Sequence, residues 1–97
     1  MNRTLQEFKD YLTYERRFSI HTISAYVGDI ESFYTFLLKQ NILDDKVTKY
    51  DIRLFMKDQI EALLDKKSLK RKIASLRHYY TFLESKNYVS ENPFLLV

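Results

Sequence analysis

The chain has 97 residues, a length that fits one hydrophobic core and leaves no room within it for a second domain. Its composition is 45% hydrophobic, 30% charged and 15% aromatic, which excludes a disordered tail because so apolar a chain can bury a core. A single glycine and a single proline leave too little turn chemistry for a multi-stranded sheet, so an all-α fold is predicted.

The absence of cysteine and the composition of the N-terminal segment exclude further classes of protein. The absence of cysteine rules out disulfides and thiolate metal sites, and two histidines alone cannot form a zinc site, so we predict no metal and no cofactor. Residues 1–7 are polar and charged, without the apolar stretch of a secretory signal. No run approaches the ~20 apolar residues that span a bilayer. We therefore predict a cytoplasmic protein with no membrane partner.

Positive charge is concentrated in one short segment. Residues 66–77 hold six of the 16 lysines and arginines and none of the 13 acidic residues, so this segment carries +6 and the rest of the chain −3. Such clustering is typical of a surface that contacts a phosphate backbone. A solvated helix face is the alternative interpretation, and charge clustering alone leaves both open.

Apolar residues recur at helical spacing in four segments, and the first two lie in the N-terminal half. Residues 4–15 form a short amphipathic pattern through Leu5, Phe8 and Leu12. A second helix is predicted from Ser19, whose hydroxyl can cap the first turn, to about Gln40. Its expected core residues are Ile23, Val27, Ile30, Tyr34 and Leu37.

Two further helices are predicted in the C-terminal half. The third begins at Thr48 with Asp51 three residues later, an approximate capping box. The fourth starts with Ser68 as its N-cap and stops near Asn87. The inward residues are expected to be Ile52, Phe55, Met56, Ile60 and Leu63 in the third helix, and Leu69, Ile73, Leu76, Tyr80 and Leu83 in the fourth. After Pro93 the chain ends in an apolar stretch, which is expected to need a partner surface.

The predicted outer face of the fourth helix is small and basic. A helical wheel places Arg71, Ala74, Ser75 and His78 opposite the core stripe. The short side chains would let the backbone approach a DNA groove, while basic side chains reach phosphates or a guanine edge. The basic residues expected to do so are Lys67, Lys70, Arg71 and Arg77. We expect Arg71→Ala with Lys72→Ala to weaken DNA binding and to leave the thermal midpoint almost unchanged.

The outer face of the second helix is also nearly bare, with Ala25, Gly28 and Ser32 clustered on it. Glycine inside a helix costs roughly 1 kcal/mol relative to alanine, so Gly28 indicates close approach by either another helix or a ligand backbone. Packing against protein is the commoner cause. The amide groups of residues 19–22 could also bind a phosphate.

Two motifs and a closing dipeptide resemble a known family. The pattern Ser19, Thr22, Tyr26, Asp29-Ile30 and Phe33 resembles the N-terminal core-binding (SAM-like) domain of tyrosine recombinases. Residues 72–83, KIASLRHYYTFL, are similar to a second helix of that domain, and Asn92-Pro93 matches its closing dipeptide. The resemblance covers nearly the whole chain and extends to Xer-type recombinases and to phage or transposon integrases.

The resemblance implies a four-helix orthogonal bundle over residues 1–97 that forms half of a clamp around duplex DNA at a recombination site. Its further implied partners are other recombinase protomers in a synaptic complex. The positions it implies for DNA contact, together with those predicted above, are Ser19, His21, Thr22, Ser24, Ala25, Lys67, Ser68, Lys70, Arg71, Lys72, Ser75 and Arg77. Two departures from the family pattern are Val27-Gly28 in place of basic residues, and Lys72 in place of arginine, which keeps the charge but loses the bidentate geometry.

The resemblance places the family's catalysis, attack of a tyrosine on a phosphodiester, in a separate C-terminal domain that is absent from this chain. None of the eight tyrosines lies in that catalytic context, and Tyr26, Tyr34 and Tyr80 fall on or beside core stripes. No carboxylate pair, activated nucleophile or glycine-rich phosphate loop can be placed, so we predict no catalytic residue and no small-molecule substrate. The leading hypothesis is a recombinase DNA-binding module, and the alternative is a helical protein-interaction domain with a solvated basic face.

Overall fold

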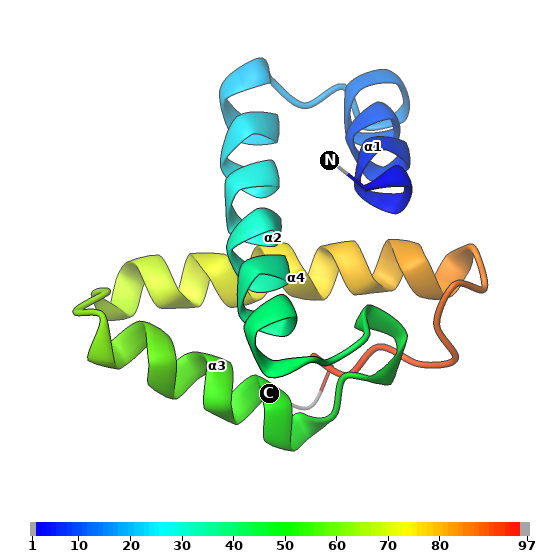
Figure 1. Cartoon of the computed structure of the whole chain (residues 1–97). Helices are drawn as coiled ribbons and strands as arrows, with labels where there is room; N and C mark the ends of the chain where they lie inside the picture. Colours follow the sequence, from blue (N-terminus) through cyan, green and yellow to red (C-terminus); the bar gives the residue numbers. More distant parts are fainter. Residues whose placement is uncertain (1, 96–97) are drawn as a thin grey trace.

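The computed structural model describes residues 2–95, and this part of the chain is all-α, as predicted, with four α-helices and no strand (Figure 1). Short π-helical and 3₁₀ turns lie between them at Tyr11–Glu15 and Asp44–Lys46. The helices are α1 (Arg3–Asp10), α2 (Ile20–Gln40), α3 (Lys49–Glu61) and α4 (Lys66–Ser85).

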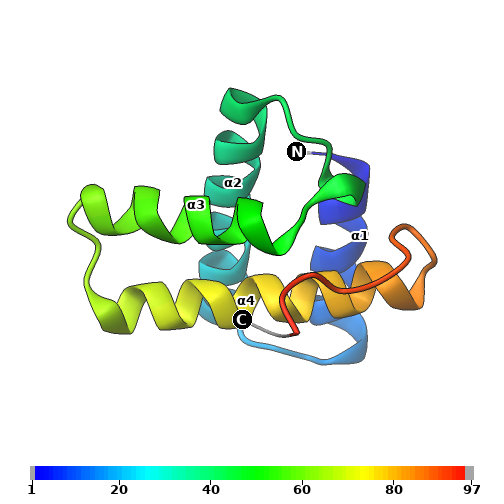
Figure 2. The same ribbon diagram turned by 90° about the horizontal axis from the view of Figure 1, so that it is seen from below.

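The helices form an orthogonal bundle around α4. Helices α3 and α4 lie side by side as a hairpin, and α2 crosses them (Figures 1 and 2). The largest helix–helix contact is between α2 and α4, and α1 packs against both. The segment after α4 turns back along that helix (Figure 2), and α4 contacts each of the other three helices.

The core is rich in aromatic rings, and the stripe predicted for the fourth helix is confirmed, since all five of its residues are buried. Rings meet edge to face at its centre, where the Phe33 and Phe55 centroids lie 5.0 Å apart, a preferred aromatic geometry. The core residues are Leu5, Phe8, Leu12, Ile23, Ile30, Phe33, Phe36, Leu37, Ile52, Phe55, Leu69, Ile73, Leu76, Tyr79, Tyr80, Phe82, Leu83, Val89 and Phe94.

The helix starts predicted at Ser19 and Thr48 are confirmed. The Ser19 hydroxyl accepts the Thr22 amide at 3.2 Å, and Thr48 and Asp51 form a complete capping box. The prediction of Ser68 as the N-cap of the fourth helix is wrong. Asp65 is the cap, because its carboxylate accepts the Ser68 amide at 2.7 Å, and this bond holds the pKa of Asp65 below its usual value.

The outer part of the stripe predicted for the third helix is not buried. Ile52 and Phe55 are buried and Met56 is half-buried, whereas Ile60 is 58% exposed and Leu63 is 91% exposed. Burial of the stripe thus decreases toward the C-terminal end of α3. This end presents apolar side chains that are largely exposed within the described residues.

The segment after α4 is fixed to the body of the domain. The Asn92 amide donates to the Arg77 carbonyl at 2.9 Å and to the Thr81 hydroxyl at 3.0 Å, and its oxygen accepts the Phe94 amide at 2.9 Å. The Phe94 side chain is completely buried in the core. The expectation of an apolar end in need of an external partner is therefore wrong for Phe94, whereas residues 96–97 lie outside the described residues. No helix within residues 2–95 has the length and apolar character to cross a membrane.

Candidate nucleic-acid interface

A buried carboxylate lies where α2 crosses α4. Asp29 of α2 is 3% exposed, and its Oδ1 accepts a hydrogen bond from Arg71 Nη2 at 2.8 Å. Its Oδ2 accepts from Arg71 Nε at 3.3 Å and from the Ser75 hydroxyl at 2.8 Å. Two side chains on α4 thus satisfy both oxygens of one carboxylate on α2 with three hydrogen bonds. A buried carboxylate needs such partners, because an unpaired charge in the core is costly.

The same contact orients the Arg71 guanidinium at the surface. The Arg71 side chain is 56% exposed although its inner edge binds Asp29. A guanidinium has five N–H donors, and two of them are used here. The other three remain available for phosphate oxygens or a guanine edge, in an orientation that the carboxylate fixes.

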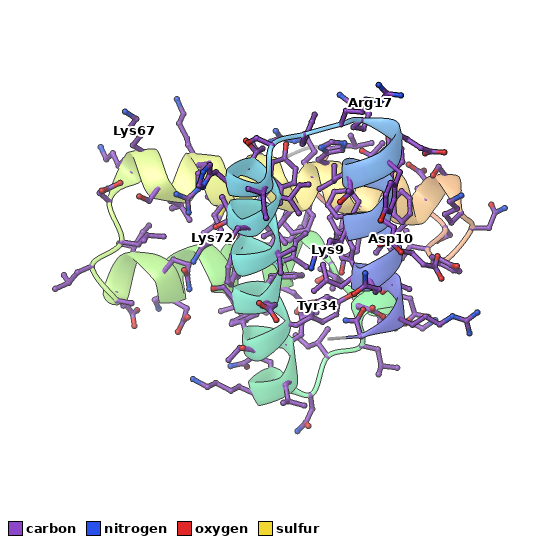
Figure 3. All side chains as sticks on the ribbon, turned by 90° about the horizontal axis from the view of Figure 1, so that it is seen from above. Lys9, Asp10, Arg17, Tyr34, Lys67 and Lys72 are labelled. Atoms are coloured by element: carbon purple, nitrogen blue, oxygen red, sulfur yellow. The ribbon has the colours of Figure 1, made fainter. Side chains whose placement is uncertain are left out.

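Lys72 turns to the inner side of the crossing. Its ammonium donates to Ser32 Oγ at 3.0 Å and to Gln59 Oε1 at 2.7 Å, so it ties α4 to α2 and α3 (Figure 3). Partial burial lowers the pKa of Lys72 from its ordinary value, and the neighbouring Asp29 charge opposes that effect. Lys72 therefore supports the helix crossing and does not project from the surface as Lys67 does.

The remaining cations of segment 66–77 differ in their surroundings. Lys66, Lys67 and Lys70 are exposed, and within residues 2–95 none of them lies in an ion pair. Lys67 points away from the body of the domain near the start of α4 (Figure 3). Arg77 is half-buried and donates through Nε to the Phe94 carbonyl at 3.3 Å. The unopposed charge thus lies in the N-terminal half of α4.

The start of α2 presents a row of small polar side chains. Ser19, His21, Thr22, Ser24 and Ala25 are all exposed, as the sequence predicts for contact residues. The Ser19 hydroxyl caps the Thr22 amide, and the amide groups at the start of a helix attract anions.

Sequence reasoning missed the arginine that stands before this turn. Arg17 is exposed, has the left-handed backbone conformation (φ 53°) and projects from the loop between the first helical segment and α2 (Figure 3). The Arg16-Arg17 doublet is the sequence signal that could have found it. Arg17 thus adds a cation to the connection that leads into α2.

Two residues predicted on the outer face of the fourth helix lie elsewhere. Ser75 is 3% exposed, because its hydroxyl points into the crossing and binds Asp29, so it is not an accessible contact residue. His78 is half-buried among the rings of Phe8, Phe18 and Tyr26. Burial lowers the pKa of His78, and the Arg16 charge adds to this effect. The accessible face of α4 is therefore narrower than the helical wheel indicates.

Gly28 is exposed and has no close protein neighbour. A Cβ atom built on it would meet no atom within 4 Å, so the expectation of tight packing against another helix is wrong. Close approach by a ligand backbone remains the other interpretation. Among residues 2–95, no group of three histidine, aspartate or glutamate side chains could hold a metal ion.

Residues 5–87 match the sequence pattern of the family described as phage integrase, N-terminal SAM-like domain. The chain belongs to this family. The SAM-like domain thus accounts for the helical fold, and the polar residues Asp29 and Ser75 join the two helices, α2 and α4, in which its motifs lie.

Similar proteins support the same assignment. The tyrosine recombinase XerC of Listeria innocua is 40% identical over 95% of this chain and 31% of its own length. A tyrosine recombinase of Pseudothermotoga lettingae is 40% identical over 96% of this chain and 33% of its own length, and XerC of Anoxybacillus flavithermus is 38% identical over 99% and 32%. This SAM-like chain spans about a third of the length of these curated relatives. No solved structure matches it significantly.

Proposed function

We propose that residues 1–97 bind duplex DNA in the cytoplasm for a site-specific tyrosine recombinase. In this proposal the start of α2 and the N-terminal half of α4 lie against the duplex and hold one side of it at the recombination site. Other recombinase protomers on the same DNA are further partners. The relatives named above carry the name tyrosine recombinase, and the family match covers most of the chain.

The observation that carries the proposal is the juxtaposition of Arg71 with unopposed lysines. Lys67 and Lys70 precede Arg71 on α4 by four residues and by one, and no acidic residue occurs among residues 66–77. The only carboxylate that Arg71 binds is buried and holds the guanidinium from behind. Exposed cations on one side of a helix crossing suit a phosphate backbone, while the arginine fork suits a base edge.

The contact set that we propose is smaller than the sequence indicated. Ser75 is excluded because it is buried, and Lys72 and Arg77 serve chiefly to hold the helices and the tail. Arg17 is added. The proposed contact residues are Arg17, Ser19, His21, Thr22, Ser24, Ala25, Lys67, Ser68, Lys70 and Arg71.

Chemical-shift mapping with a mixed-sequence duplex tests the proposal. We expect the largest shifts at the amides of residues 19–25 and 67–71. Lys67→Glu with Lys70→Glu should weaken binding by about tenfold or more, because two phosphate contacts become repulsions. Lys39→Glu with Lys49→Glu changes the total charge equally at exposed sites elsewhere and is the matched control. Equal binding by the two double variants would contradict the proposal.

The alternative function, a protein-interaction domain that docks through its apolar end, loses one support. Phe94 is buried in the core of its own domain and is held by Asn92. Silence of residues 67–71 on addition of duplex would still favour that alternative.

A further inference from the structure

A hollow of about 840 Å³ lies between α3 and α4, beside the proposed DNA-contact residues. Its floor is apolar and consists of Met56 from α3 with Leu69 and Ile73 from α4. The hollow follows α4 from Lys66 to Arg77, about three helical turns or roughly 16 Å at 1.5 Å per residue. We name this hollow the α3–α4 groove.

Exposed apolar side chains follow Met56 toward the end of α3, although they do not line the groove itself. Ile60 follows Met56 by four residues and lies on the same side of the helix, with 58% of its surface exposed. Leu63 follows in the turn and is 91% exposed. Adjacent exposed apolar side chains next to a groove are typical of a surface that another molecule covers.

The rim of the groove is cationic. Lys66, Lys67, Lys70 and Arg77 line it, and no acidic residue does. A second copy of the chain that docked through the same surface would bring these like charges together, which disfavours a symmetric dimer there. Duplex DNA would satisfy the cations but offers little apolar surface to Ile60 and Leu63. An occupant must therefore combine negative charge with an apolar stripe.

We propose that the α3–α4 groove binds a short acidic amphipathic helix from a partner protein. Apolar side chains at i, i+3, i+4 and i+7 of that helix lie on Met56, Leu69 and Ile73 and extend over Ile60. Acidic side chains on its flanks face the lysines of the rim. The proposal does not depend on DNA binding by the start of α2, and the two surfaces share Lys67 and Lys70.

Fluorescence anisotropy with a labelled synthetic peptide tests the proposal. The peptide has about three helical turns, with leucine on one face and glutamate on the others. We expect saturable binding by the 97-residue chain, with chemical shifts at Met56, Ile60 and Ile73. A peptide with serine in place of leucine should bind at least about tenfold more weakly, because it has no apolar face to bury.

Matched variants locate the binding. Ile60→Asp should weaken peptide binding about tenfold, whereas Leu38→Asp, at a 79% exposed position on α2, should not. Lys66→Glu should weaken binding and Lys39→Glu should not. If Ile60→Asp lowers the thermal midpoint, Leu63→Asp replaces it, because Leu63 is 91% exposed.

Four results would overturn the proposal. The first is no saturable peptide binding below about 1 mM, and the second is equal binding of the serine peptide. The third is that duplex DNA, and not the peptide, shifts Met56 and Ile73, which would assign the groove to nucleic acid. Concentration-dependent dimerisation that Ile60→Asp abolishes would also overturn it, since the occupant would then be a second copy.

Discussion

Arg71 of α4 and Asp29 of α2 form a two-point contact between a half-exposed guanidinium and a buried carboxylate, with Nη2 2.8 Å from Oδ1 and Nε 3.3 Å from Oδ2. The pair links the fold to the proposed function. Its inner half holds the crossing of two helices, and its outer half presents oriented donors to solvent. The expectation that Arg71→Ala with Lys72→Ala leaves the thermal midpoint almost unchanged is therefore replaced, because the loss of Arg71 alone removes two donors from a buried charge.

A double-mutant cycle on this pair should show strong coupling. Asp29→Ala and Arg71→Ala are each expected to lower the free energy of unfolding by about 1–3 kcal/mol, since each leaves a hydrogen-bonded partner unsatisfied. The double variant should lose less than the sum, with a coupling energy of about 0.5–3 kcal/mol. Urea unfolding followed by circular dichroism measures all four proteins.

The exposed pair Lys57 and Glu61 is the matched control for that cycle. Its atoms lie 3.9 Å apart and both side chains are largely exposed, so its coupling should not exceed about 0.5 kcal/mol. Additive effects at Asp29 and Arg71 would show that the contact contributes nothing to stability.

The salt dependence of duplex binding should reflect the smaller number of available cations. Six phosphate contacts would give a slope near −5 in log K against log salt, at about 0.9 for each contact. The contact set that we propose contains four cations, Arg17, Lys67, Lys70 and Arg71, so we expect a slope of about −4. Anisotropy titrations with a labelled duplex over a salt series give this number. A flat response would argue against contact with phosphates.

Gly28→Ala should stabilise the domain. Alanine is favoured over glycine within a helix by roughly 0.5–1 kcal/mol, and the new Cβ meets nothing within 4 Å. Ala25→Gly, on the same exposed side of α2, should cost about the same amount and is the reciprocal control. Thermal unfolding measures both variants. A stabilised Gly28→Ala protein with weaker duplex binding would show that DNA approaches this position closely.

His78 should make the domain less stable in acid. Burial holds the pKa of His78 below its usual value of 6.5, so the unfolded chain takes up the proton first as the pH falls. The free energy of unfolding should therefore decrease on acidification from about pH 6.5 until the folded-state pKa is passed. His78→Gln should remove this part of the pH dependence, whereas His21→Gln, at an exposed position, should leave it. Identical pH profiles for wild type and His78→Gln would refute the assignment.

The helices were predictable because their signals are local. Spacing of apolar residues identified all four segments, and the caps at Ser19 and Thr48 were read from neighbouring residues. The start of α4 was misplaced because Asp65 and Ser68 are both good caps, and only the backbone geometry selects between them. The burial of α3 was overestimated because periodicity shows which side of a helix is apolar and not how far a neighbour covers it.

The candidate site was predictable as a charged segment but not as a set of contacts. A helical wheel treats Arg71, Lys72 and Ser75 as independent side chains around an axis. Their roles diverge only because α2 brings a carboxylate and Ser32 to the crossing. Asp29 lies 42 residues before Arg71, and Ser32 lies 40 residues before Lys72. A single amino-acid sequence does not indicate pairings over such separations.

Asn92 and Phe94 fix the position of the segment that follows α4. The Asn92 side-chain amide is hydrogen-bonded to α4 and the Phe94 ring is buried in the core, so the position of Leu95 relative to that helix is defined. A dye attached at Leu95 would therefore have a fixed attachment point relative to the domain. Energy transfer from such a handle to a labelled duplex would report how the domain is oriented on its DNA.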